Sequence, residues 1–153
     1  AILDEELFRA IDHPQRFVFQ CDYPHRDYGN TCRHKAWEYA TGEMCLYLDD
    51  DNWLDGNRVL GDIHGALTSP LFDPPNWAIF PIMRFGHKFF NDPPGLCMTD
   101  TMNVVAKREI ARWPDMPDYT ADGHWVEGLK KYPYRAFPDF RPIGVMQKAS
   151  EGK

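Results

Sequence analysis

The chain has 153 residues, of which 43% are hydrophobic and 14% aromatic, and its formal net charge is −6. This length and composition predict one globular domain over residues 1–153 and not a disordered chain. The acidic balance disfavours a broad nucleic-acid surface, and no apolar run approaches the roughly 18 residues that a membrane span requires.

The cysteines favour free thiols over a metal site. Four cysteines could form two disulfides in a secreted protein, but no two of them form a Cys-x-x-Cys pair of the kind that binds zinc. No signal peptide opens the chain, so we expect reduced thiols in a cytoplasmic protein. The residues concerned are Cys21, Cys32, Cys45 and Cys97.

The first half of the chain predicts helices that alternate with strands. Asp4 is a suitable N-cap for the first helix, and Gly42 a suitable C′ residue for the second. The apolar run before the aspartates at 49–51 is short enough for a buried strand. The predicted elements are a helix over 5–11, a strand over 16–20, a helix over 31–41, a strand over 44–48 and a helix over 57–67.

The second half predicts more strands and one further helix. A strand over 77–85 contains Pro81, which places it at a sheet edge or a bulge. Gly86-His87 is expected to turn it into a short partner over 88–90. The remaining predictions are a strand over 102–106, a helical turn over 107–112, a helix over 122–131 and short strands over 134–137 and 143–147. Strands that alternate with helices predict an α/β fold.

Three consecutive carboxylates, Asp49, Asp50 and Asp51, follow the predicted strand over 44–48. They repel one another unless they are solvated or share a cation, and hard divalent cations such as Mg²⁺ prefer carboxylate oxygens. Asp49 and Asp51 form an Asp-x-Asp pair that could hold one Mn²⁺ or Mg²⁺ together with a diphosphate. The alternative is a solvated acidic turn before the next helix.

A second pattern lies directly upstream of the aspartates. Arg33 and His34 stand where family 2 glycosyltransferases of the GT-A fold carry Arg-Asn, and an Ala-x-Gly-Glu motif precedes the strand and the Asp-x-Asp pair. The segment therefore resembles the core of that family. The matching small residues and glutamate are Gly29, Ala36, Ala40, Gly42 and Glu43.

The resemblance implies a metal-dependent, inverting transfer of a sugar from a nucleoside diphosphate donor to a hydroxyl acceptor. It implies that Asp49 and Asp51 hold the metal and that Arg33, Asp49 and Asp50 contact the donor. It also implies a GT-A-like mixed sheet flanked by helices that is incomplete at its N-terminus, because the family's first β-α-β unit has no counterpart in the chain.

Asp122 matches the position of the family's catalytic base, at the start of a helix with an apolar face. One base suffices for inversion, because it removes the acceptor proton while the acceptor oxygen attacks the anomeric carbon. The expected preceding Glu is Ala121 here. Asp122 could also be only an N-cap.

Other side chains are weaker candidates. His124 could add a metal ligand, and the resemblance places Asp100 and Asn103 in a loop that faces the sugar and the acceptor, although both are also common turn formers. Tryptophans could stack on sugar rings, although burial is the commoner reason for an aromatic residue. These tryptophans are Trp53, Trp77, Trp113 and Trp125.

Two other functions compete with the transferase. One is a module that binds a nucleotide-sugar or carbohydrate without catalysis. The other is an Asp-x-Asp phosphatase of the haloacid-dehalogenase type, which also begins with an apolar strand and two aspartates. That family requires Thr or Val where this chain has Trp53.

Overall fold

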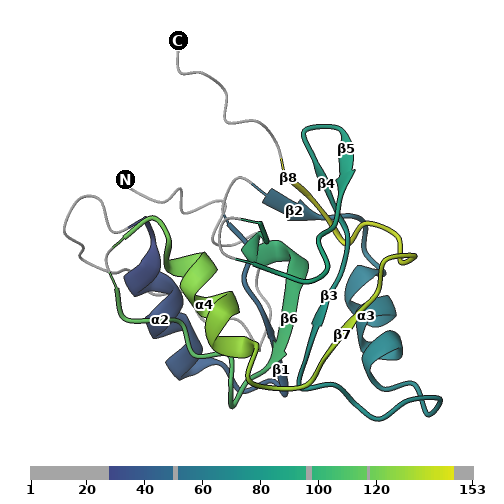
Figure 1. The fold of residues 1–153 in the computed structure, drawn as a ribbon, viewed down its shortest axis with the longest axis horizontal. Helices are drawn as coiled ribbons and strands as arrows, with labels where there is room; N and C mark the ends of the chain where they lie inside the picture. Colours follow the sequence, from purple (N-terminus) through teal and green to yellow (C-terminus); the bar gives the residue numbers. More distant parts are fainter. Residues whose placement is uncertain (1–27, 50–51, 96–97, 117, 147–153) are drawn as a thin grey trace, which may run out of the picture.

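The computed structural model describes residues 28–49, 52–95, 98–116 and 118–146. These residues form a mixed α/β fold with three α-helices and two four-stranded sheets (Figure 1). The predicted helix over 5–11 and strand over 16–20 lie outside the described residues.

The first sheet has the strand order β1-β6-β3-β7 and mixes antiparallel and parallel pairs. β6 is antiparallel to both β1 and β3, whereas β3 and β7 are parallel. The strands are β1 (Met44–Leu46), β3 (Trp77–Ile79), β6 (Val104–Lys107) and β7 (Tyr134–Ala136).

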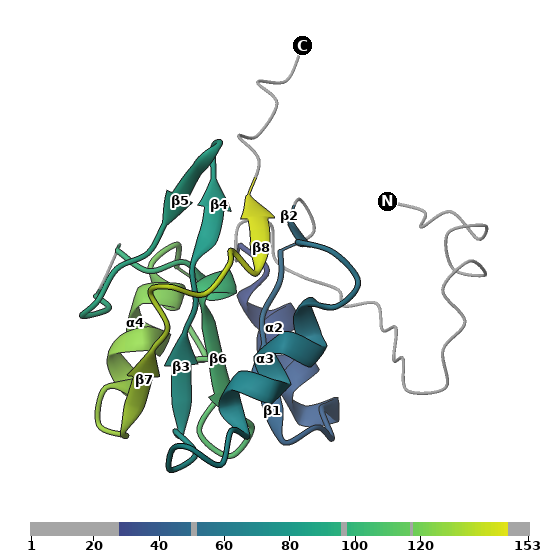
Figure 2. The same ribbon diagram turned by 90° about the vertical axis from the view of Figure 1, so that its right-hand side faces the viewer.

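The second sheet has the order β2-β8-β4-β5 and lies at one end of the first (Figures 1 and 2). β4 and β5 form a hairpin whose two turn residues, Phe85 and Gly86, both have positive φ (51° and 85°). Such a turn matches the twist of a hairpin, and glycine adopts it at low cost. The strands are β2 (Asn52–Leu54), β4 (Ile82–Arg84), β5 (His87–Phe89) and β8 (Gly144–Met146).

The predicted strand over 77–85 is wrong as one element, because its two halves belong to different sheets. β3 ends at Ile79 and β4 begins at Ile82. Between them, Phe80 donates its N–H to Asn103 (2.8 Å), and Pro81 has no N–H to donate. The proline therefore marks the crossing between the sheets.

Three predicted helices are present with small changes at their ends. They are α2 (Asn30–Tyr39), α3 (Val59–Leu67) and α4 (Ala121–Leu129). The predicted strand over 102–106 begins later, since residues Thr101–Asn103 form the 3₁₀ helix η1 and only Val104 onward joins β6. The residues after β6 form a turn, closed by Ile110 N–H to Lys107 and Ala111 N–H to Arg108.

Both faces of the first sheet are buried. Along β3, Trp77 and Ile79 contact one hydrophobic cluster, which includes residues of α4, while Ala78 contacts the other, which includes residues of α3. This alternation follows from the two-residue period of a strand. Accordingly, α2 and α4 cover one face and α3 covers the other (Figure 2).

Gly144 is where the second sheet packs most closely on η1. A Cβ there would overlap the Sδ atom of the fully buried Met102 and lie 3.0 Å from the carbonyl oxygen of Trp53. We expect Gly144→Ala to destabilise the fold by about 1–3 kcal/mol, because the added methyl group would displace the buried Met102 side chain and crowd the backbone carbonyl of Trp53. Urea unfolding measures this.

Gly128→Ala is the matched control, since Gly128 is an exposed residue of α4 and a methyl group added there would have no neighbouring atom within 4 Å. It should stabilise the fold by up to about 1 kcal/mol, because alanine favours helix over glycine. Equal effects of the two substitutions would contradict the packing described for Gly144.

Candidate functional site

The aspartate cluster begins at the junction of the two sheets. Asp49 follows β1 of the first sheet, and Asn52 opens β2 of the second. The N–H of Asn52 donates to the carbonyl of Asp49 (3.1 Å). Asp50 and Asp51, the predicted donor and metal residues, lie outside the described residues.

Arg33 and Asp49 form an ion pair, although they come from α2 and from the loop after β1. The Nη1 atom of Arg33 also donates to the carbonyl of Tyr28 (2.8 Å), and its guanidinium lies 5.0 Å from the centroid of the Trp113 ring. The two side chains are 21% and 30% exposed. A planar guanidinium suits simultaneous pairing with a carboxylate and stacking on a ring. The structure therefore brings two predicted donor residues together.

Asp100 is a part-buried carboxylate on which the charges of other site residues act. Burial raises the pKa of Asp100, and the negative charges of Asp49 and Asp122 raise it further. The N–H of Met102 and the charge of Arg84 oppose this shift. Charges act strongly on one another only at short range in a protein. The charges of Asp49 and Asp122, which come from two other segments of the chain, therefore both act on Asp100.

Asp100 and Asn103 hold the turn before β6. The N–H of Met102 donates to Oδ1 of Asp100 (3.0 Å), and the N–H of Asp100 donates to Oδ1 of Asn103 (3.1 Å). Asn103 is 1% exposed, and its Nδ2 donates to the carbonyl of Phe80 (2.7 Å). The amide of Asn103 is thus engaged within the protein, and of its two predicted roles the structure shows the turn former.

Asp122 lies in the first turn of α4, one residue inside its start at Ala121. The residue at the N-cap is Thr120, so the interpretation of Asp122 as an N-cap is wrong. Its Oδ1 accepts the N–H of Gly123 (2.7 Å). The apolar face predicted for this helix is confirmed, with Trp125, Val126 and Leu129 buried.

His124 does not share a helix face with Asp122, because residues two apart point in different directions on a helix. It is exposed, and its charge acts on Asp118, whose pKa is lowered mainly by hydrogen bonds from Thr120. His124 and Asp122 therefore point to different sides of α4, and the role of His124 as a metal ligand beside Asp49 and Asp51 stays a prediction. Among the residues that the structure describes, no three His, Cys, Asp or Glu side chains are grouped as a metal site.

Tyr47 belongs to an aromatic cluster that packs next to Arg33. Its ring contacts Trp113 and Trp125 edge-on (centroids 4.9 and 5.1 Å), and its hydroxyl donates to the carbonyl of Ala111 (2.9 Å). Burial is the main reason that the pKa of Tyr47 is raised. The burial of Trp113 and Trp125 explains them as packing residues, as it does for Trp77, whereas Trp53 is 43% exposed.

Buried hydrogen bonds fix this aromatic cluster relative to α2. The Nε1 atom of Trp113 donates to Oδ1 of Asn30 (3.1 Å), and Nδ2 of Asn30 donates to the carbonyl of Asp118 (2.8 Å). Asn30 is 4% exposed and opens α2, which carries Arg33. This asparagine was not predicted from the sequence, and its position directly after Gly29 in the resembling motif was the available signal.

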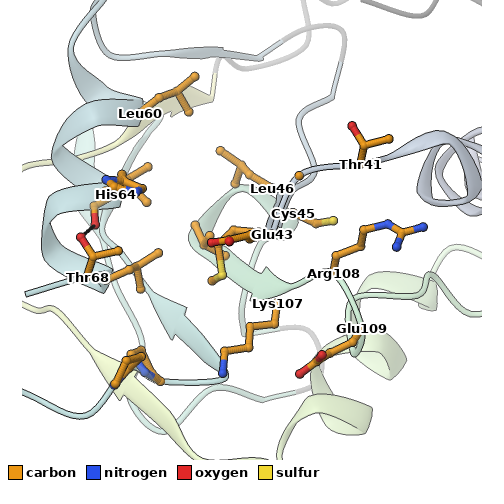
Figure 3. Close-up of a pocket in the computed structure, with 17 residues that line it drawn as sticks. Thr41, Glu43, Cys45, Leu46, Leu60, His64, Thr68, Lys107, Arg108 and Glu109 are labelled. Carbon is orange, nitrogen blue, oxygen red and sulfur yellow. Dashed lines mark hydrogen bonds between the residues drawn. The ribbon is translucent and has the colours of Figure 1, made fainter. Parts of the chain in front are cut away.

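A separate groove of about 560 Å³ lies between β1, the end of β6 and α3 (Figure 3). Leu46, Leu60 and Ile63 give it apolar walls, and His64 and Lys107 add polar groups. None of the predicted site residues that the structure describes lines it. It follows the chain from Thr41 through β1 to Leu46 and does not include Asp49. The groove and the carboxylates are therefore distinct places on the molecule.

Neither the known protein families nor the curated proteins give a match to this chain. Within residues 28–146, none of the helices that the structure describes has the length and apolar character needed to cross a membrane.

The raised pKa of Asp100 predicts a pH-dependent effect of its charge. The folded chain holds the Asp100 proton more tightly than the unfolded chain, so stability is lost as pH rises through the pKa of the folded state. Asp100→Asn keeps an oxygen for the N–H of Met102 and removes the repulsion from Asp49 and Asp122. We expect this variant to gain stability relative to wild type at pH 7 and to lose that gain near pH 3.

Urea unfolding at the two pH values measures the difference. Asp139→Asn, a change of the same charge at an exposed residue, is the control. A destabilised Asp100→Asn at pH 7, with the control unchanged, would mean that the carboxylate is held by favourable contacts and not against repulsion.

Proposed function

We propose that this chain forms the core of a metal-dependent, inverting glycosyltransferase with a GT-A-like fold. The donor would be a nucleoside diphosphate sugar and the acceptor a hydroxyl group. The observation that carries this proposal is the ion pair between Arg33 and Asp49, two residues that the sequence resemblance assigns to the donor. The charges of Asp49 and of the candidate base Asp122 also act on Asp100.

The divalent cation is proposed from the Asp49-x-Asp51 pair of the sequence. The described residues contain no group of three metal-ligating side chains, and Asp49 is the member of this pair that they include. Asp49 pairs with Arg33 through Oδ1. Asp49 and Asp51 would hold Mn²⁺ or Mg²⁺, which would neutralise the leaving nucleoside diphosphate.

Each remaining side chain has a role in the proposed transfer. Asp122 would accept the proton of the acceptor hydroxyl while that oxygen forms its bond to the anomeric carbon, and the bond to the diphosphate oxygen breaks on the opposite side. Asp122 lies in the first turn of α4. Arg33, stacked on Trp113, would hold the donor side of the site.

Donor binding is the first test. We expect either UDP or GDP to bind the chain in the presence of Mn²⁺ and to bind much more weakly without it, as measured by calorimetric titration. Asp49→Asn should weaken binding with Mn²⁺ by roughly tenfold or more, because it removes one charged ligand of the cation. Asp139→Asn should bind as wild type does. Tight binding by Asp49→Asn would exclude Asp49 from the metal and donor site.

The base is tested separately from binding. Asp122→Asn should keep Mn²⁺-dependent binding of the nucleotide but lower transfer or hydrolysis of the matching nucleotide-sugar by about 10²–10⁴-fold, since the amide cannot accept the proton. Steady-state kinetics measure this loss. Unchanged turnover would remove Asp122 as the base. Binding without any turnover by the wild-type chain would favour the non-catalytic sugar-binding module.

A further inference from the structure

A row of three paired residues crosses three strands of the second sheet, with the polar side chains Asn52 and Arg84 at its two ends and Met146 between them. We call it the polar row. Asn52 of β2 pairs with Met146 of β8, and Met146 pairs with Arg84 of β4. Residues paired across neighbouring strands project from the same face of a sheet. Leu54 and Ile82, two residues away on the same strands, pack in the hydrophobic cluster beneath α3. Asn52 and Arg84 are therefore the polar end of an otherwise apolar face.

Buried side-chain atoms of Asn52 and Arg84 have no hydrogen bond to the described residues. Asn52 is 8% exposed, and in the part of the chain that the structure describes neither Nδ2 nor Oδ1 has a hydrogen bond. The buried Nε atom of Arg84 has none either, and no carboxylate of the described residues forms an ion pair with Arg84. Each unpaired buried group costs about 1–3 kcal/mol, so such groups in a native protein call for an explanation.

Two aromatic rings lie beside the guanidinium of Arg84. Its guanidinium carbon is 5.0 Å from the centroid of Phe89 and 5.4 Å from that of Phe85. Phe85 has a φ of 51°, which is costly for a bulky side chain, and it is 52% exposed in the hairpin turn. Backbone strain of this kind tends to gather at binding and catalytic sites. The hairpin therefore provides an aromatic support for an arginine that none of the described carboxylates neutralises by an ion pair.

The polar row also lies beside the proposed site. The charge of Arg84 acts on Asp100, and the N–H of Asn52 bonds to the carbonyl of Asp49. Met102 of η1, two residues after Asp100, packs against Gly144 in the second sheet. The row thus borders the carboxylates on the side of the second sheet, whereas Arg33 borders them from α2.

We infer that Arg84 and Asn52 form a subsite for a phosphate group of the substrate, an inference that rests on the proposed function. A guanidinium and an amide N–H are donors that match phosphate oxygens, and a part-buried arginine without an ion pair to the described residues is suited to an anion from outside the chain. The group could be the diphosphate of the donor or a phosphate carried by the acceptor. Because carboxylates repel an anion, binding should require Mn²⁺.

The test uses two simple probes with the full chain in Mn²⁺. Inorganic pyrophosphate represents the donor, and hexyl phosphate represents an acceptor that carries a phosphate. Arg84→Met should weaken binding of at least one probe by roughly tenfold or more while the variant stays folded, because it removes the guanidinium that would hold the phosphate. Arg84→Lys keeps the charge without the planar fork and should be intermediate.

Arg135→Met is the matched control. Arg135 of β7 also stacks on an aromatic ring, with its guanidinium carbon 4.1 Å from the centroid of Phe72, but it belongs to the first sheet. We expect it to bind both probes as wild type does. Calorimetric titration of each variant gives the affinities, and urea unfolding confirms that each is folded.

Each outcome decides a separate point. Loss confined to pyrophosphate would assign the subsite to the donor, and loss confined to hexyl phosphate would assign it to the acceptor. Unchanged binding of both probes by folded Arg84→Met, or no binding of either probe by wild type, would overturn the inference even if UDP or GDP still binds. Arg84-dependent binding of pyrophosphate without binding of UDP or GDP would retain the subsite and remove the nucleotide-sugar donor.

Discussion

The ion pair between Arg33 and Asp49 is the interaction around which this end of the molecule is arranged. It joins α2 to the loop after β1, and the charges of Asp49 and Asp122 both act on Asp100 at the start of η1. The buried hydrophobic clusters on the two faces of the first sheet hold these elements in place. Arg33 neutralises part of the charge through its ion pair with Asp49.

Asn103, which bonds to Asp100, also joins the two sheets. Asn103 bonds to the backbone of Asp100 on one side and to the carbonyl of Phe80 on the other. Phe80 lies between β3 of the first sheet and β4 of the second. The position of Asp100 is therefore coupled to the crossing between the sheets, and Arg84 at the end of β4 is placed by that crossing.

Local patterns in the sequence predict α2, α3 and α4 and the strand before Asp49, because capping residues and apolar spacing act within a few positions. The division at Pro81 was missed, since an apolar run does not reveal that its halves pair in different sheets. Arg84 and Asn52 were missed for a related reason. Their common face depends on pairing through β8, far away in the chain, which no local pattern contains.

A solvated acidic turn explains the aspartate run with the fewest assumptions, whereas the proposed function also gives the neighbours of Asp49 a role. Such a turn needs neither an arginine stacked on a buried tryptophan nor two further carboxylates from distant segments. It also gives no reason for the fold to bury the side-chain amide of Asn52 and the Nε atom of Arg84 beside it without hydrogen bonds from the described residues. The proposed function accounts for these groups, because a bound anion would supply the hydrogen bonds that the described residues do not.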